Sequence, residues 1–192
     1  VQTTAAGETV QSYTDVYMGD GHNVLAASTG FGNSASVHNQ YGYATLGRDG
    51  SELFQSNGSD IDAQTYVTLD HWSGYGSATA YGVGNSALIS NSVSDTGLFA
   101  NQENTGQVYT QAQFTGQSMV GGTAVLNATS IGNASTAILC NTCGDAVLQG
   151  GVNQVNSGQV IARGQAFVPN SGGIYGSATA VGNSATFESR GH

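Results

Sequence analysis

The feature that most constrains this chain is a tetrapeptide, Gly-Asn-Ser-Ala or Gly-Asn-Ala-Ser, that returns at intervals of 52, 48 and 50 residues. A nearly fixed period of this size is typical of repeat proteins, in which each unit buries its apolar face only against its neighbours. The sequence therefore predicts one continuous stack of similar layers. The tetrapeptide begins at Gly32, Gly84, Gly132 and Gly182.

The segments upstream of each tetrapeptide alternate small or β-branched residues with polar ones. This alternation with period 2 indicates strands that have one packed face and one wet face. Asn-Thr-Gly-Gln-Val at 104–108 returns as Asn-Ser-Gly-Gln-Val at 156–160, which sets the register of the repeat. In that register the packed faces take every second residue, starting from Val10, Ile61, Val108 and Val160.

These patterns predict an all-β fold, a repetitive β-solenoid or stacked sheet without helices. No stretch of ten or more residues keeps the 3.6-residue period of a helix without glycine interruption. Matching segments at 51–55, 97–101 and 145–149 add a further strand, so we expect about four short strands in each unit of about 50 residues. The single domain spans 1–192, with units at about 10–60, 61–107, 108–159 and 160–192, the last one partial.

The tetrapeptide itself lies between two alternating runs, and we expect a tight turn there. Glycine at the first central position suits a type II′ hairpin turn, which would make the flanking strands antiparallel neighbours. In the alternative, a β-arch, the two strands belong to different sheets of one solenoid coil, and repetition of the whole unit favours this arrangement slightly. The expected turn residues are Gly32, Asn33, Gly84, Asn85, Gly132, Asn133, Gly182 and Asn183.

The formal net charge is −9, with no lysine and three arginines, Arg48, Arg163 and Arg190. Nucleic acids and anionic membranes are bound through clustered Lys and Arg, so we expect neither as a partner. The absence of lysine also removes a usual protection of exposed strand edges, which indicates edges that pair with other chains. No apolar run is long enough to span a bilayer. The composition is typical of exported bacterial surface proteins, so we expect an extracellular location at the outer membrane.

The cysteines, Cys140 and Cys143, form a Cys-x-x-Cys pair. A redox function would need a helix N-terminus, and a zinc site would need four ligands; the sequence offers neither. In an exported protein the pair is best explained as a short disulfide that fixes a loop.

Other polar residues suggest no chemistry. The histidines at 22, 38, 71 and 192 are scattered and have no acid or nucleophile at a useful spacing. Asp20-Gly21, Asp49-Gly50 and 57–60 could bind calcium, although the turn chemistry of Asp, Asn and Gly explains them more simply. We therefore expect no catalytic residues, no cofactor and no metal, and a protein that is not an enzyme.

Aromatic residues gather at positions 41–81. Exposed tyrosine or tryptophan rings can stack on sugars or anchor a protein partner. The alternative is cross-strand packing within the stack. The residues concerned are Tyr41, Tyr43, Trp72, Tyr75 and Tyr81.

Two resemblances follow from these motifs. The segment 30–40, with Gly-x-Gly-Asn-Ser-Ala and a following Gln, resembles a curlin repeat. Curlin repeats are about half as long as the period of about 50 residues in this chain. Ser-Ala-Thr-Ala followed by Gly-Asn-Ser-Ala, at 77–87 and 177–185, more closely resembles the holdfast anchor proteins of the HfaD type. That resemblance covers most of the chain. It implies secretion by a curli-like outer-membrane pathway and a role in tying an adhesive polysaccharide to the cell.

We therefore expect an extracellular structural or adhesive protein that anchors or polymerises through open strand edges and tethers a holdfast polysaccharide. Its expected partners are further copies of itself, related fibre subunits or a polysaccharide. The alternatives are a curli-like functional amyloid subunit and a carbohydrate-binding module that does not polymerise. A polysaccharide lyase would need clustered Asp, Arg, Lys or His, and an ice-binding solenoid would need a Thr-x-Thr ladder in every coil; neither pattern is present.

Overall fold

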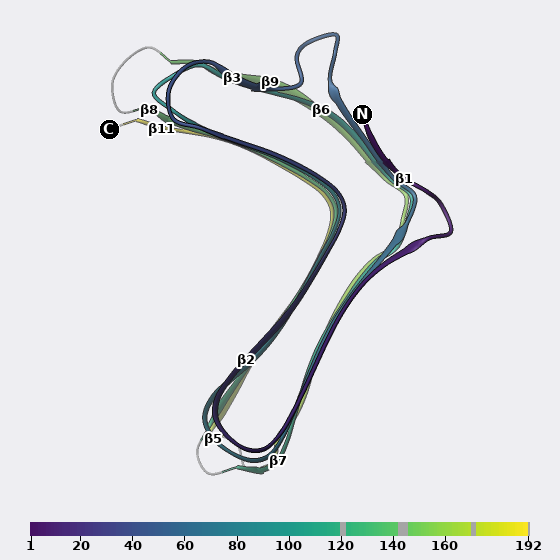
Figure 1. Ribbon diagram of the computed structural model, residues 1–192, viewed down its shortest axis with the longest axis vertical. Coiled ribbons are helices and arrows are strands. Elements are labelled where there is room, and N and C mark those ends of the chain that lie inside the picture. The colour runs from purple at the N-terminus through teal and green to yellow at the C-terminus, as the bar shows by residue number, and fades with distance from the viewer. Residues whose placement is uncertain (120–121, 142–145, 170–171, 192) are drawn as a thin grey trace.

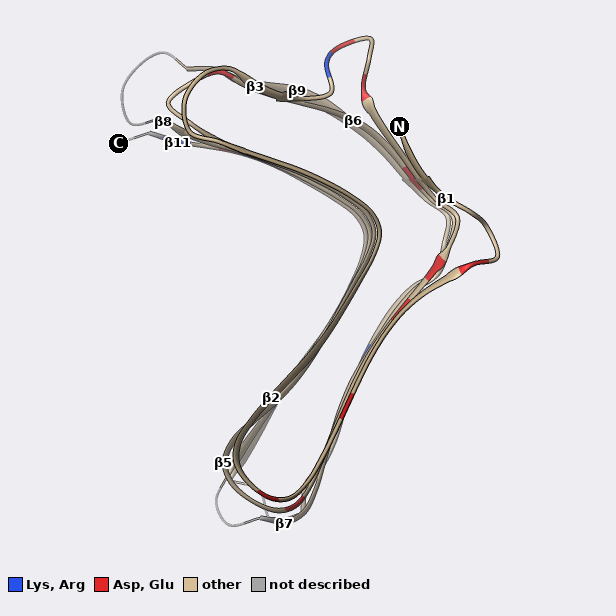
Figure 2. Ribbon diagram, in the orientation of Figure 1, with Lys and Arg blue, Asp and Glu red and all other residues tan. Residues whose placement is uncertain are grey.

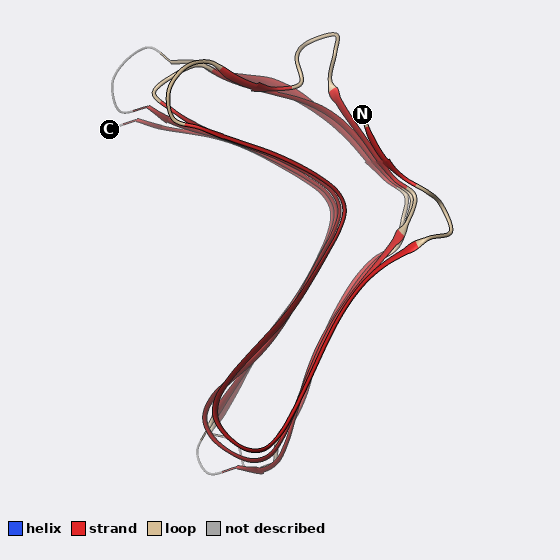
Figure 3. Cartoon of the chain, viewed as in Figure 1, coloured by secondary structure: helices blue, strands red, loops and turns tan. Residues whose placement is uncertain are grey.

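The computed structural model describes residues 1–119, 122–141, 146–169 and 172–191, and these parts of the chain are strands, turns and bends without a helix (Figure 3). The predicted all-β repetitive fold is confirmed. The strands are β1 (Gln2–Thr4), β2 (Thr9–Asn39), β3 (Ala44–Leu46), β4 (Leu53–Asn57), β5 (Asp60–Ser92), β6 (Thr96–Asn104), β7 (Val108–Met119), β8 (Thr123–Asn141), β9 (Leu148–Asn156), β10 (Val160–Phe167) and β11 (Gly173–Gly191).

The chain winds through four stacked turns, which we call rungs 1 to 4. They comprise residues 2–46, 53–98, 100–150 and 152–191. Every ladder between these strands is parallel, and each strand pairs with its equivalent one rung away. The turns therefore superimpose when the molecule is viewed along the stack (Figure 1). The result is a parallel β-solenoid.

The predicted register of the packed faces is confirmed. Val10 pairs with Ile61, Ile61 with Val108, and Val108 with Val160. In the two middle rungs, every residue of this face is at most 1% exposed, from Ile61 to Val67 and from Val108 to Phe114. Small residues are needed because identical positions lie one strand spacing apart in a parallel stack.

The cross-section of the solenoid is a bent loop with two arms that meet at a corner (Figure 1). One arm, between the first and second halves of β5, holds the larger apolar cluster, which is centred on Trp72 and Phe114. The other arm, between β6 and the ends of β5 and β8, holds a smaller cluster that includes Ile89 and Leu98. The corner between the two arms is polar.

The expected tight turn at Gly-Asn is wrong. Each Gly-Asn pair lies inside a long strand, as Gly32 and Asn33 do in β2, and the flanking runs pair with other rungs and never with each other. The long strands bend where the two arms meet, and this bend forms the corner (Figure 1). A hairpin is thereby excluded, and the arrangement is closer to an arch of low curvature.

The expected four short strands per unit are also wrong, because β2 and β5 run for 31 and 33 residues. The match between 51–55 and 97–101 was misleading. Leu53 pairs with Ala100, whereas Leu98 pairs with Leu46 and with Gly150. The loop between β3 and β4, which links rung 1 to rung 2, places the two Leu-Phe pairs at different positions of the turn.

Candidate functional site: amide ladders and the open ends

Three columns of amide side chains run through the corner of the solenoid, parallel to its axis. Within each column the amide of one rung donates a hydrogen bond to the amide oxygen of a neighbouring rung, over 2.6–2.8 Å. We call them the first Asn ladder, the second Asn ladder and the Gln ladder. Their members are Asn33, Asn85, Asn133 and Asn183; Asn57, Asn104 and Asn156; and Gln2, Gln55, Gln102 and Gln154.

The ladders are buried in the middle rungs, where their members are fully shielded from solvent. A buried amide is costly unless its donors and acceptors are paired. Here the second N–H of each amide finds a backbone carbonyl, as Asn85 does at Glu103 O (2.7 Å) and Asn57 at Ser59 O (2.9 Å). The columns are therefore satisfied only when equivalent residues lie directly above one another.

The glycine of the tetrapeptide makes room for this arrangement. A Cβ on Gly84 would lie 2.3 Å from Asn104 Oδ1 and 2.5 Å from Gly132 O, and Gly32 and Gly132 face equally short contacts. Both residues of the Gly-Asn pair thus serve the ladders. Glycine admits the second Asn ladder, and asparagine builds the first.

The ladders have a direction. In the first Asn ladder each Nδ2 donates toward the C-terminal end, from Asn33 to Asn85 and from Asn133 to Asn183. In the Gln ladder each Nε2 donates toward the N-terminal end, from Gln55 to Gln2 and from Gln154 to Gln102. Each end of the stack therefore carries both an amide donor and an amide acceptor.

The two ends of the stack are unpaired edges, and at rung 4 interior positions are exposed. β2 and the pair β10 and β11 lie at opposite edges of the larger sheet, each with one edge unpaired among the described residues. In rung 4, Ala166 and Ala178 are exposed, although their equivalents Phe114 and Ala128 in rung 3 are fully buried. Unpaired edges of this length are templates for another strand.

The end rungs differ in charge. Rung 1 carries three carboxylates, Glu8, Asp15 and Asp20, and no arginine. Rung 4 carries Arg163 and Arg190 with Glu188 as its sole carboxylate. Charged residues are sparse in the chain (Figure 2), so this difference distinguishes the two end rungs.

The five aromatic residues predicted as a surface cluster do not gather in one place. Tyr41 and Tyr43 are 73% and 57% exposed in the turn before β3, whereas Tyr75 is 41% exposed within β5. Tyr81, half-buried, packs edge-on against Phe31 at 5.8 Å between ring centroids.

Trp72 is not a surface residue. It is 3% exposed, and its ring centroid lies 4.9 Å from that of Phe114. The register shifts at the tip of the arm, where the pairing is irregular between Gly21 and Asn23 and where Gly74 has a φ of 98°. The alternation of buried and exposed residues changes phase just before this irregularity, between Leu69 and Trp72, so the tryptophan lies inside.

A polar aromatic face that the prediction overlooked lies on the outside of the larger sheet. Tyr13 and Tyr66 are 5.4 Å apart between ring centroids, and the guanidinium of Arg163 lies 5.7 Å from the ring of Tyr109. Hydrogen bonds along the strands hold the face flat, as from Tyr66 to Gln64 (2.5 Å) and from Gln64 to Asp62 (2.7 Å). The sequence feature that indicates this face is the set of polar and tyrosine residues that alternate with the packed residues along each strand.

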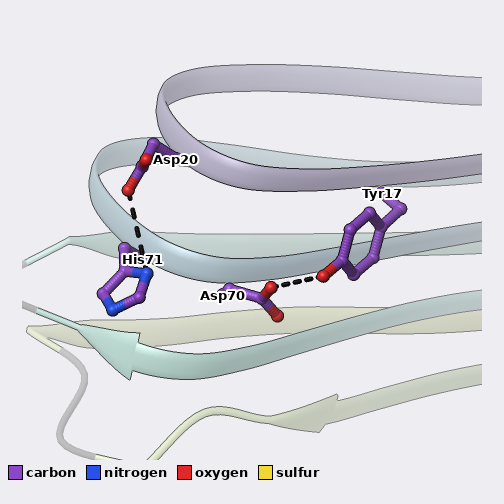
Figure 4. A network of polar contacts seen from close by, with 4 residues as sticks. All are labelled: Tyr17, Asp20, Asp70 and His71. Atoms are coloured by element: carbon purple, nitrogen blue, oxygen red, sulfur yellow. Dashed lines mark hydrogen bonds and ion pairs between the residues drawn. The ribbon is translucent and has the colours of Figure 1, made fainter.

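Two polar pairs join rung 1 to rung 2 near the tip of the arm that holds the larger apolar cluster (Figure 4). The hydroxyl of Tyr17 donates to the carboxylate of Asp70, and this hydrogen bond raises the pKa of Tyr17 above its usual value. Asp20 Oδ1 lies 3.7 Å from His71 Nδ1, and both side chains are largely exposed. Exposed pairs of this kind contribute little to stability.

The other polar candidates remain isolated. Cys140 lies half-buried in β8, and Cys143 is outside the described residues, so their disulfide stays a prediction. His192 is also outside them. Among the described residues, no three potential metal-ligating side chains come together.

The fold, the ladders and the unpaired ends define a parallel β-solenoid with polar ladders at its corner. The family model of holdfast attachment protein D (HfaD) matches the chain twice, at residues 1–100 and 91–191. The chain therefore belongs to the HfaD family, as the resemblance predicted. Comparisons with curated proteins and with solved structures found no match. Within the described residues, no helix is long and apolar enough to cross a membrane.

Proposed function

We propose that the chain serves holdfast attachment, the role that its family has at the bacterial cell surface, as a rigid, non-enzymatic anchor. Its ends join other β-rungs through their open edges. The joined rungs belong to further copies of the chain or to related surface fibre subunits, and the assembly tethers the holdfast polysaccharide.

The observation that carries this proposal is the pair of unpaired edges, together with the exposed core positions of rung 4. A single rung cannot bury its apolar face alone. Each end rung has a neighbouring rung on one side only, so its other side is open to another rung. Small residues and amides dominate these edges, and they carry no lysine and, in β2, β10 and β11, no proline, the residues that usually block edge-to-edge pairing.

The test is association of the purified chain. We expect sedimentation velocity to show concentration-dependent growth, and electron microscopy to show elongated particles whose cross-section matches one solenoid. A species that stays monomeric at high concentration, with no elongated particles, would refute the proposal.

The outer aromatic face supports a second function in the same assembly, contact with the polysaccharide. Tyrosine rings beside oriented Gln and Asp side chains are the chemistry that sugar rings and hydroxyls require. Replacing Tyr13 and Tyr66 by alanine should weaken retention on a polysaccharide affinity gel. The matched control, Tyr41→Ala, should not weaken it, because Tyr41 is exposed but stands apart from this face.

A further inference from the structure

We propose that copies of this chain join head to tail only, with rung 4 of one copy placed in register on rung 1 of the next. The amide ladders select this polarity. The inference rests on the proposed association through open edges and adds the identity and direction of the joint.

The ladders carry complementary groups to the two ends. The second Nδ2 hydrogen of Asn183 continues the direction of the first Asn ladder, and Asn33 Oδ1 has no donor among the described residues. In the Gln ladder, Gln2 Nε2 donates to Ser34 O and keeps a second hydrogen, while Gln154 Oε1 is the open acceptor. Rung 4 on rung 1 therefore matches one donor with one acceptor in both ladders.

The second Asn ladder closes in the same way. In rung 1 its place is taken by Thr4, whose hydroxyl donates to Asn57 Oδ1. A hydroxyl can also accept one hydrogen bond, so Thr4 of the next copy would accept from Asn156 Nδ2. Like ends cannot form these matches, because parallel pairing needs the same strand direction on both sides of the joint.

Charge favours the same joint. Rung 1 is acidic, whereas rung 4 holds two of the three arginines of the chain. The register places Arg163 above Tyr13 of the next copy, because Tyr13 pairs with Gln64, Gln64 with Gln111 and Gln111 with Arg163. Asp15 of the next copy lies two residues further along the same face, within reach of a long side chain.

The chain already contains one example of such a joint. The family model matches it twice, each time over about two rungs, so the contact between rungs 2 and 3 joins two family units. That contact pairs Asn85 with Asn133 and Gln55 with Gln102 through the ladders. The proposed joint repeats it with Asn183 on Asn33 and Gln154 on Gln2.

Two isosteric variants block one end each. Asn183→Asp keeps the oxygen that accepts from Asn133, but it replaces the outgoing donor by a carboxylate oxygen. Gln2→Glu keeps the oxygen that accepts from Gln55 and makes the same replacement at the other end. Each change places two acceptor oxygens opposite each other in the joint. It should therefore raise the concentration needed for association about ten-fold or more.

Head-to-tail joining predicts an unusual result for the mixture. Each variant alone remains monomeric where the unmodified chain associates, because every joint includes one blocked end. Mixed, they form a 1:1 dimer and stop, because only rung 4 of the Gln2→Glu chain on rung 1 of the Asn183→Asp chain is unblocked. Asn153→Asp and Gln40→Glu, on exposed positions outside the ladders, serve as controls and should assemble normally.

Analytical ultracentrifugation of the 192-residue chain, its variants and the mixture decides the matter. Association of the Asn183→Asp chain with itself would indicate joints between two rungs 1, and that of Gln2→Glu joints between two rungs 4. Either result, or a mixture without dimers, would overturn the polarity while the proposed function stands. An unmodified chain that never associates would overturn both.

A second pair of variants guards against misfolding, because it changes only exposed side chains. Asp15→Arg and Arg163→Glu each place like charges across the joint and should each weaken association. Their mixture restores opposite charges at every joint, so it should assemble into long alternating particles. A mixture no better than its components would contradict the proposed register.

Discussion

Replacing Asn85 by alanine tests whether the ladders hold the solenoid together. Asn85 is fully buried, accepts from Asn33 Nδ2 (2.8 Å) and donates to Asn133 Oδ1 (2.8 Å) and Glu103 O (2.7 Å). The substitution removes a donor from Asn133 Oδ1 and from Glu103 O, removes the acceptor of Asn33 Nδ2, and opens a small cavity. Each orphaned buried group costs about 1–3 kcal/mol, so we expect a loss of about 2–4 kcal/mol.

The control is the same substitution at the end of the ladder. Asn183 is exposed and makes its hydrogen bonds at one edge of the stack, so Asn183→Ala should lose at most about 1 kcal/mol. Urea unfolding followed by circular dichroism, at concentrations where the chain is monomeric, measures both. If Asn85→Ala shifts the midpoint no more than Asn183→Ala does, the ladders are not a source of stability and the reasoning fails.

Three further predictions follow from single positions. Gly84→Ala should lower the melting temperature by several degrees because its Cβ would clash with ladder atoms at 2.3 Å, whereas Gly176→Ala, with open space at its Cβ, should not. The fluorescence of the single tryptophan, Trp72, should be blue-shifted and resistant to iodide quenching, which an exposed ring would not be. The difference in alkaline absorbance titration between the unmodified chain and Tyr17→Phe should have its midpoint above pH ~10, because the hydrogen bond to Asp70 raises the pKa of Tyr17. The stabilisation by this hydrogen bond is present below the ordinary pKa of tyrosine and is lost as the pH rises through the raised pKa of Tyr17. A difference titration with its midpoint at or below pH ~10 would contradict the raised pKa.

Much of the fold could be predicted because its information is local and repeated. Alternation with period 2 identified the packed faces, and the repeated Asn-x-Gly-Gln-Val segment set a register that places Val160 on Val108. The same alternation could not place Trp72, because it assumes a straight strand. At the tip of the arm the alternation changes phase between Leu69 and Trp72, so a tryptophan that strict alternation would leave exposed is buried instead.

The role of the Gly-Asn pair could not be predicted from its own segment. Locally, glycine followed by asparagine is a turn signal. The hairpin and the β-arch considered for the sequence both assume a turn at this pair. The reason for these residues lies far away in the sequence. Asn33 meets Asn85, 52 residues further on, and Gly84 leaves room for Asn104 of the next rung. Contacts between rungs decide the residue type, and a strand bend replaces the turn.

The ladders also explain how a stack with so small a core keeps its register. Along the packed face, a slip of two residues exchanges alanine for threonine or valine and changes little apolar burial, so the core alone discriminates weakly between registers. The same slip would move every amide of the corner away from its partner and leave buried donors and acceptors unpaired. A joint between two copies must also select one register among those that differ by two residues, and it buries even less core. Amides are therefore best placed where the structure has them, in three columns that run from one open end to the other.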